Sequence, residues 1–287
     1  MKTQNSFQTD DSGVLYIVPT PIGNLEDITI RALNTLKSVD LIAAEDTRNT
    51  KKLLNHFEIN KPLVSYHEHN KKSRETSLLE KLAAGEDIAL VSDAGMPAIS
   101  DPGYEIVAAA IEAEYKVIVL PGANAALCAL VGSGISPGEF YFYGFLPRKN
   151  KAREEELQRL KKIPAALLFY ESPHRLKDTL KSLEILGERK IVIARELTKR
   201  YEEYIRGNVT ELLEWTENGV LKGEFCIIVE GGDEVEEESD WWKELSIEQH
   251  VNYYIEAQGQ PSKTAIKKAA EDRKVPKREV YQAYHVK

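Results

Sequence analysis

The chain has few cysteines and no long hydrophobic run, and each shortage excludes a class of protein. Only Cys128 and Cys226 occur in its 287 residues, and neither belongs to a C-x-x-C pair. The sequence therefore predicts neither a disulfide framework nor a thiolate metal site, as expected for a reducing cytoplasm. No apolar stretch approaches the roughly 20 residues that a membrane-spanning helix needs. Residues 1–13 are polar and lack the apolar centre of a signal peptide, so we expect a disordered leader there and no membrane partner.

Positive charge and phosphate-binding glycine patterns are also scarce. The net charge of -8 argues against a chain that coats nucleic acid indiscriminately. The sequence contains no G-x-x-x-x-G-K-[ST], and no G-x-G-x-x-G follows the first expected strand, so a nucleotide phosphate site is a poor fit. Two segments are positively charged, although the chain as a whole is negative. Residues 148–162 carry seven Lys and Arg against three Glu, and residues 261–287 carry eight against three acids. Such segments suit phosphate contacts, although charge alone favours a solvated helix face.

Short apolar segments alternate with helix-like segments through the first half of the chain. Strands that are apolar throughout, separated by helices, are typical of a mainly parallel sheet with helices on both faces. The expected strands are 14–18, 40–44, 88–91 and 117–120, and the expected helices are 28–38, 73–84 and 105–113.

The second half predicts another α/β domain and then a helical one. Its expected strands are 140–145, 165–170, 191–194 and 225–229, with helices over 151–162 and 175–186. Because Ser136-Pro137-Gly138 has the composition of a linker, we place the two α/β domains at 14–136 and 137–232. Residues 233–243 form an acidic linker. Residues 244–287 predict three short helices over 247–258, from an N-cap at Ser262 to 273, and after Pro276. This order is typical of a helix-turn-helix-like domain, although small helical caps look similar.

Three loops rich in glycine or proline follow expected strands of the first domain: TPIGN (20–24), SDAGMP (92–97) and LPGANA (120–125). In open α/β sheets ligands bind beyond the carboxyl ends of the strands, and glycine lets the backbone approach them closely. A tight turn explains any one of these loops. Three at equivalent positions, with the polar Asp93 and Asn24 inside them, favour a cofactor crevice.

Polar clusters elsewhere leave alternatives open. Glu45-Asp46-Thr47-Arg48 follows the second strand and predicts either cleft groups or a local ion pair at a helix start. His67-Glu68-His69-Asn70 lacks a third ligand at a metal-binding spacing, so we expect no metal and instead a hydrogen-bonding segment at the cleft mouth. The segment 171–175 predicts cleft groups, a helix N-cap at Ser172, or both.

Eight motifs in order carry a resemblance to a known family: TPIGNLEDITIRA, AAEDTR, SYHEHN, VSDAGMPAISDPGYE, LPGANAAL, FYGFLPRK, FYESPHRL and ARELTKRYEE. The sequence resembles the ribosomal RNA small subunit methyltransferase I family of the tetrapyrrole-methylase superfamily over about residues 14–231. The resemblance implies two α/β domains with S-adenosylmethionine in the cleft between them, a C-terminal helical extension, and a homodimer. The implied reaction is 2′-O-methylation of a decoding-centre cytidine ribose in small-subunit ribosomal RNA, either free or in the assembled subunit.

The same motifs imply roles for individual residues. The implied cofactor contacts are Asp93, Ala94, Gly95 and Met96 with Pro121, Gly122 and Ala123, above a cleft floor of Pro21, Gly23 and Asn24. The implied nucleotide-facing residues are Arg48, Asn70, Arg148, Lys149, Glu171, His174, Arg175 and Glu196.

A general base would help a ribose hydroxyl to attack, by about 10²–10⁴-fold. His67, Glu68 or Lys199 could serve, and the sequence does not choose among them, although we favour the 67–68 segment. Two other functions compete with this one. The first is methylation of a small tetrapyrrole-like acceptor, which would need neither the basic segment 148–162 nor the helical tail. The second is a nucleic-acid-binding regulator without enzymatic activity, which would leave the second-half motifs unused.

Overall fold

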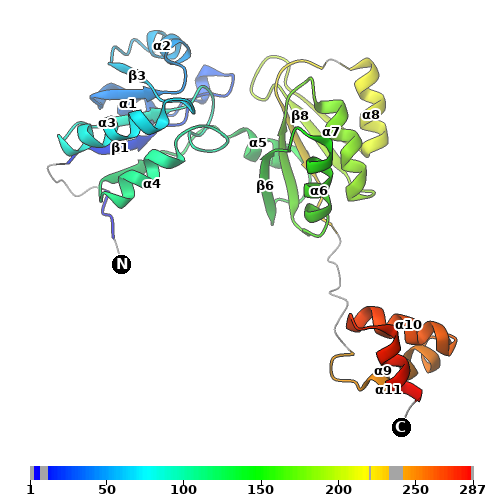
Figure 1. Ribbon diagram of the computed structural model, residues 1–287. Coiled ribbons are helices and arrows are strands. Elements are labelled where there is room, and N and C mark those ends of the chain that lie inside the picture. The colour runs from blue at the N-terminus through cyan, green and yellow to red at the C-terminus, as the bar shows by residue number, and fades with distance from the viewer. Residues whose placement is uncertain (1–2, 7–11, 220, 233–241, 286–287) are drawn as a thin grey trace. The chain divides into compact units, whose positions relative to one another are not determined.

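The chain contains two five-stranded sheets, the helices that cover them, and a further group of helices at the C-terminus. The computed structural model describes residues 3–6, 12–219, 221–232 and 242–285. The chain divides into two units after Gly232. Both sheets belong to the first unit, and each carries helices on its faces (Figure 1). No helix among the described residues is long and apolar enough to cross a membrane.

The first sheet is parallel throughout, which confirms the expectation for the first half of the chain. Its strand order is β3-β2-β4-β1-β5. The strands are β1 (Val14–Ile17), β2 (Leu41–Ala44), β3 (Leu63–Ser65), β4 (Ile88–Val91) and β5 (Lys116–Val119). The helices of this part are η1 (Leu25–Asp27), α1 (Ile30–Ser38), α2 (Thr47–His56), α3 (Lys71–Ala83) and α4 (Tyr104–Glu112). β3 was not expected from the sequence, and α2 was considered only as a helix start at residues 45–48.

Side chains of the first sheet alternate between two separate cores. Leu15 and Ile17 of β1 pack with Leu78 of α3 and Ile106 of α4. Val18, just after β1, packs on the other face with α1 and α2. Since successive residues of a strand point to opposite faces, an apolar strand can serve both cores.

The second sheet is mixed, with order β6-β7-β10-β8-β9. β6 runs parallel to β7, whereas β7 with β10, β10 with β8, and β8 with β9 are antiparallel. Its strands are β6 (Phe140–Phe145), β7 (Ala166–Glu171), β8 (Ile191–Arg195), β9 (Glu203–Gly207) and β10 (Phe225–Val229). α6 (Asn150–Leu160), α7 (Leu176–Leu183) and α8 (Val209–Asn218) contribute to the core on one face, and η2 (Glu184–Leu186) follows α7.

Helix α5 (Ala125–Ser133) covers the opposite face of the second sheet. Ala126, Ala129 and Leu130 pack against Leu168 of β7 and Ile228 of β10. From the sequence, these residues were expected in the first domain, with a boundary at residue 136. The packing therefore places the change of core before α5, at the loop that follows β5.

The C-terminal unit is a bundle of α9 (Ile247–Glu256), α10 (Ser262–Arg273) and α11 (Lys277–His285). Ala269, Ala270 and Val280 are buried in its core. His250 is fully buried, and its Nδ1 accepts a hydrogen bond of 3.1 Å from Arg273. The predicted N-cap at Ser262 is wrong by one position, because Pro261 occupies the N-cap and Ser262 is the first helical residue.

The N-terminal leader includes a residue that is attached to the first sheet. The Gln4 side chain accepts a hydrogen bond from the Val117 N–H at 3.0 Å and donates one to the Val117 carbonyl at 2.9 Å. These bonds cover part of the exposed edge of β5, which is the kind of edge that proteins protect. Residues 7–11 of the predicted leader and 233–241 of the predicted acidic linker lie outside the described residues.

The position of α5 generates a test with a matched control. Leu130 is 2% exposed and packs on the second sheet, whereas its neighbour Val131 is 76% exposed. Leu130→Ala is expected to lower the free energy of unfolding by about 2–5 kcal/mol, because it leaves a cavity in a packed core. Val131→Ala should change it by less than about 0.5 kcal/mol. Chemical denaturation measures both, and equal effects of the two variants would contradict this packing.

Candidate functional site

The strand order of the first sheet brings the three glycine- and proline-containing loops together. β4, β1 and β5 are neighbours and parallel, so the loops that follow them lie at one edge. The backbone groups of Thr20 and Gly95 exchange two hydrogen bonds of 2.9 Å. The Thr20 hydroxyl also donates to the Ser92 carbonyl at 3.1 Å. The loops after β1 and β4 therefore form one connected surface.

The backbone conformation at this junction favours glycine at position 95, and the space beside it is limited. The Gly95 φ of +81° lies in the left-handed region that favours glycine. A Cβ there would also lie 3.2 Å from Ile22 Cγ2 and 3.6 Å from the Ala123 carbonyl oxygen. Ile22 follows β1 and Ala123 follows β5, so all three loops meet around this glycine.

A cleft of about 370 Å³ opens beside these loops. The first sheet contributes residues that follow β1, β2, β4 and β5, and the second sheet contributes residues at the ends of β6, β7 and β8. β10 contributes its first residues, because it is antiparallel to β7 and β8 and so begins at the edge where they end. The lining residues are Ile22, Glu45, Asp93–Met96, Ile99–Asp101, Asn124, Ala125, Phe145, Tyr170–Pro173, Glu196, Leu197, Lys199 and Glu224–Cys226.

Carboxylates are concentrated in the first-sheet wall of the cleft. Asp93 accepts hydrogen bonds from the Asp46 N–H at 3.2 Å and from the Asn49 side chain at 3.0 Å. The Asp93 N–H in turn donates to Glu45 at 3.3 Å. Burial raises the pKa of Glu45, and the neighbouring carboxylates of Asp93 and Asp46 raise it further.

Asp101 has the most perturbed carboxyl group of this wall. Burial raises its pKa to about 7, and the negative charges of Glu45 and Asp93 add to the increase. A hydrogen bond with Ser92 acts in the opposite direction and does not offset them. The side chain therefore titrates near neutral pH while it faces the cleft, which is characteristic of functional sites.

On the second-sheet side, Lys199 lies between two carboxylates. Its Nζ is 2.9 Å from Glu196 and 3.6 Å from Glu224. Burial acts to lower the pKa of Lys199, but the hydrogen bond to Glu196 and the charge of Glu224 outweigh burial and raise it. A lysine held protonated in this way cannot accept a proton near neutral pH. This environment is unfavourable for the general-base role considered for Lys199. Lys199 and Glu196 both line the cleft.

Backbone strain is concentrated in two loops that line the cleft. Ala98 and Ser100, after β4, have φ of 66° and 63°. Glu196 and Thr198, after β8, have φ of 50° and 65°. Left-handed conformations are unfavourable for such residues, and most of all for the β-branched Thr198. Strain of this kind often occurs at binding and catalytic sites.

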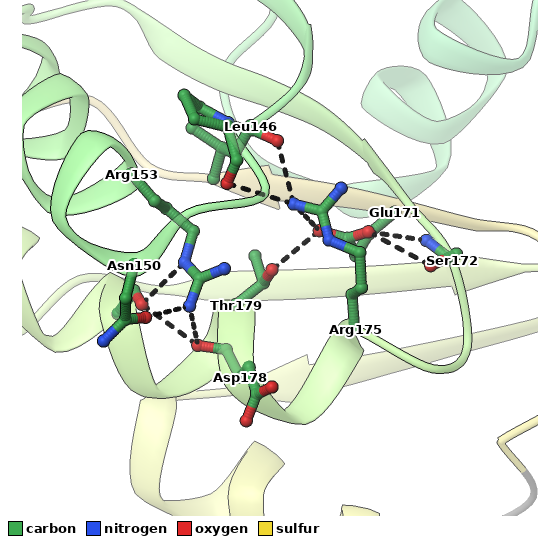
Figure 2. A network of polar contacts seen from close by, with 10 residues as sticks. Leu146, Asn150, Arg153, Glu171, Ser172, Arg175, Asp178 and Thr179 are labelled. Carbon is green, nitrogen blue, oxygen red and sulfur yellow. Dashed lines mark hydrogen bonds and ion pairs between the residues drawn. The ribbon is translucent and has the colours of Figure 1, made fainter.

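Glu171 and Arg175 serve mainly to hold loops together (Figure 2). The Glu171 side chain has no exposed surface and accepts hydrogen bonds from the Thr179 hydroxyl at 2.6 Å and the Ser172 N–H at 2.8 Å. Arg175 Nη2 lies 3.5 Å from Glu171 and donates to the Leu146 carbonyl at 2.8 Å. These contacts join the loop after β6 to the start of α7. The structure therefore shows a structural role for both side chains, and their contact with a nucleotide stays a prediction.

The predicted N-cap at Ser172 is also wrong, because Arg175 occupies the N-cap position of α7. The basic segment 148–162 is likewise less available than its charge suggests. Arg153 of α6 is 4% exposed and donates to the Ser182 hydroxyl at 2.9 Å.

The His67–Asn70 segment follows β3 and does not line the cleft. His67 is half-buried, and no described group forms a hydrogen bond with its buried Nδ1. It lies near enough to Glu45 for its charge to lower the pKa of that carboxyl. Glu68 is exposed and pairs with Lys71 at 2.7 Å. Asn70 uses its side chain to join the His67 N–H to Ser65, so it stabilises the turn.

Several other sequence-predicted residues lie outside the cleft lining. Asp46 is the N-cap of α2, and its ion pair of 2.6 Å with Arg48 lowers the pKa of the Asp46 carboxyl to about 2. The local interpretation of this cluster as an ion pair at a helix start is thus confirmed. Arg148, Lys149 and His174 are exposed.

The predicted cofactor contacts divide into three groups. Asp93, Ala94, Gly95 and Met96 line the cleft as expected. Pro21 and Gly23 line a neighbouring hollow instead, which shares Asp93 with the cleft, and Asn24 caps η1. Pro121, Gly122 and Ala123 are not lining residues, but the two positions after them, Asn124 and Ala125, are.

Sequence reasoning missed several residues of the cleft. Asp101, Phe145 and Tyr170 all lie inside motifs that carried the family resemblance, but no role was assigned to them from the sequence. Glu224 and Cys226 had no signal. They reach the cleft only because β10 is antiparallel to its neighbours, and the sequence pattern does not reveal strand direction. Among the described residues, no group of three or more His, Cys, Asp and Glu could hold a metal ion.

Comparison with known proteins agrees with this architecture. The family model described as Tetrapyrrole (Corrin/Porphyrin) Methylases matches residues 14–213. A ribosomal RNA small subunit methyltransferase I from Bacillus subtilis (strain 168) is 57% identical over 291 residues, which is 100% of this chain and 99% of that protein.

Solved structures resemble the first unit in fold. The cobalamin biosynthetic enzyme cobalt precorrin-4 methyltransferase has a TM-score of 0.58 at 18% identity, over 76% of this chain and 94% of its own. Uroporphyrin-III C-methyl transferase from Thermus thermophilus, solved in complex with S-adenyl homocysteine, has a TM-score of 0.54 at 19% identity, over 78% of this chain and 99% of its own.

The raised pKa of Asp101 predicts a pH-dependent stability. In the folded chain this carboxyl has a pKa of about 7, above its ordinary value of 3.8. Between these values the folded state holds a proton that the unfolded state has released, so the free energy of unfolding falls as the pH rises through this window. Above this pH window the free energy of unfolding no longer changes through Asp101. Asp101→Asn should therefore stabilise the chain more at pH 8 than at pH 5.

Thermal unfolding of both chains across this pH range measures the effect. Glu80→Gln, which removes an exposed carboxyl on α3 outside the cleft, is the control and should show no such trend. Parallel stability curves for the wild type and Asp101→Asn would contradict the assignment.

Proposed function

Because the chain belongs to the ribosomal RNA small subunit methyltransferase I family of tetrapyrrole methylases, we propose that it uses S-adenosylmethionine to methylate small-subunit ribosomal RNA. The acceptor we propose is the 2′-oxygen of a decoding-centre cytidine ribose, the position that the sequence motifs imply. The observation that carries the proposal is the acidic cleft at the strand ends of both sheets.

The cleft residues fit a ligand of this chemistry. A volume of about 370 Å³ falls in the range of about 300–1,000 Å³ typical of small-molecule sites. The donor carries a sulfonium and an ammonium, and the carboxylates of Glu45, Asp93 and Asp101 suit cations. The rings of Phe145 and Tyr170 belong to the same lining and meet edge to face, with their centroids 5.7 Å apart, so they offer aromatic contacts for an adenine.

We propose that residues 93–96 and 124–125 hold the donor, while Pro121, Gly122 and Ala123 shape the loop that presents it. The sulfonium supplies an electrophilic methyl group that a hydroxyl oxygen can attack in line. The protein must then fix the hydroxyl on the correct side of that methyl. Such positioning can lower a two-reactant barrier by about 7–11 kcal/mol at best.

His67 is the base that we propose for the ribose hydroxyl. Of the three candidates, Lys199 is held protonated between Glu196 and Glu224, and Glu68 is paired with Lys71 away from the cleft. His67 has a buried nitrogen that no described group hydrogen-bonds, and it lies beside Glu45 of the cleft wall. Imidazole is the group most often used for proton transfer near neutral pH.

Contacts with the RNA backbone are proposed for exposed residues that follow β6 and β7. Arg148 and Lys149 follow Leu146 and Pro147 in the loop after β6, whose last residue lines the cleft, and His174 comes directly after the lining residue Pro173. Cations at such positions can hold phosphates beside the site without reading the base. Helices α10 and α11, which lie within the basic segment 261–287 of the C-terminal unit, are proposed to add further contacts of this kind.

The family resemblance also implies a homodimer, and we propose that the chain acts as one in the cytoplasm. Light scattering of the purified protein should give twice the mass of the chain. A monomer at working concentration would contradict this part of the proposal.

The proposed reaction is tested by incubating the purified chain with labelled S-adenosylmethionine and either small subunits or free small-subunit RNA. A methyl on a ribose 2′-oxygen blocks alkaline cleavage of the next phosphodiester bond. We therefore expect one alkali-resistant dinucleotide that contains cytidine. Label on a base, or transfer only to a tetrapyrrole acceptor, would contradict the proposal.

The role of His67 predicts a kinetic effect in the same assay. His67→Ala should lower kcat by about 10²–10⁴-fold, with little change in KM for the methyl donor, since the base acts only on the acceptor hydroxyl. His69, an exposed ring 6.0 Å away, provides the control, and His69→Ala should retain activity. An unchanged kcat in His67→Ala would exclude this base.

A further inference from the structure

The charges that line the cleft are strongly unbalanced. Within the described part of the chain, its lining includes six carboxylates and one ammonium group. Three of the carboxylates have cationic partners, because Glu171 pairs with Arg175 and both Glu196 and Glu224 pair with Lys199. The other three, Glu45, Asp93 and Asp101, form no ion pair with a described cation.

These three carboxylates lie on one wall. Glu45 follows β2, while Asp93 and Asp101 belong to the loop after β4, the neighbouring strand. The Asp93 N–H donates to Glu45, and the charges of Glu45 and Asp93 both act on Asp101. Glu224 and Tyr170 of the second sheet also face Asp101, and His67 faces Glu45. Within a cleft that shields them from water, several carboxylates attract a cation more strongly than they would on an open surface.

We propose that Asp101, supported by Glu45, makes the cleft discriminate by charge between the cationic methyl donor and its neutral product. The inference rests on the proposed function and concerns the selectivity of the same site. During transfer the carbon–sulfur bond breaks and its electron pair stays on sulfur, while the carbon–oxygen bond forms and the hydroxyl proton passes to a base. The sulfonium thereby becomes an uncharged thioether.

The loss of that charge removes the attraction to Asp101 at the moment when the product must leave. The same carboxylate would therefore strengthen binding of the donor and leave binding of the product, S-adenosylhomocysteine, nearly unchanged. No other difference between the two ligands is as large, since they share the adenosine and the amino-acid ends.

Protonation of Asp101 makes the discrimination dependent on pH. Because its pKa is about 7 in the empty cleft, a bound cation should favour the ionised form and displace a proton near neutral pH. Donor binding should then release a proton and weaken below pH 6, whereas product binding should do neither.

Isothermal titration calorimetry at pH 8 tests the proposal with the whole chain, using S-adenosylmethionine and S-adenosylhomocysteine as probes. For Asp101→Asn we expect the Kd for the donor to rise about tenfold more than the Kd for the product, a difference of about 1.4 kcal/mol. Asp101→Glu, which keeps the charge, should restore most of the donor affinity. Glu80→Gln removes a charge outside the cleft and should leave both constants unchanged.

Proton release is measured by repeating the donor titration at pH 7 in buffers of different ionisation enthalpy. On binding the donor, the wild type should release a fraction of a proton, whereas Asp101→Asn should release none. Equal changes in both Kd values, or no change in either, would overturn the proposed discrimination while leaving the methyltransferase function intact. If the wild type bound neither ligand, the proposed function itself would fail.

Discussion

Two backbone hydrogen bonds between Thr20 and Gly95 connect the loops on which the rest of the site depends. They are possible because β1 and β4 are parallel neighbours, and because glycine at position 95 can adopt a positive φ without a Cβ that would crowd Ile22. The junction fixes the direction in which the following residues, up to Asp101, leave the sheet. The acidic wall of the cleft is therefore a consequence of backbone geometry.

The same wall costs stability. Asp93 accepts a hydrogen bond from the Asp46 N–H at the start of α2. Asp101 is partly buried among other carboxylates, and no described cation forms an ion pair with it. Ser100 and Glu196, which both have a positive φ, lie on the two sides of the same cleft. Proteins tolerate such local costs where function requires them, and the extensive apolar cores of both sheets can support them. The second sheet shows the opposite solution, since Lys199 pairs with both Glu196 and Glu224 and offsets part of their charge.

Much of this arrangement could be predicted from the sequence. Apolar strands alternating with helices gave the parallel first sheet, and the strand-end loops at 20–24 and 92–97 gave the position of the cleft. Strand direction in the second sheet could not be predicted, because buried strands are apolar whether they are parallel or antiparallel. Glu224 was missed for that reason. Side-chain partners were equally hidden. Arg175 pairs with Glu171, and Lys199 with Glu196, only because the chain turns between them, and Lys199 also pairs with Glu224 of a distant segment.

The central claim is that the three strand-end loops of the first sheet and the facing ends of the second sheet form one donor-binding cleft. Hydrogen–deuterium exchange with and without S-adenosylhomocysteine tests it most directly, because bound ligand slows exchange where the backbone contacts it. We expect protection in residues 93–101 and 124–126, which follow β4 and β5 of the first sheet, together with 196–199, which follow β8 of the second sheet. Protection confined to the separate hollow around residues 187–190 and 206–211 would contradict the account.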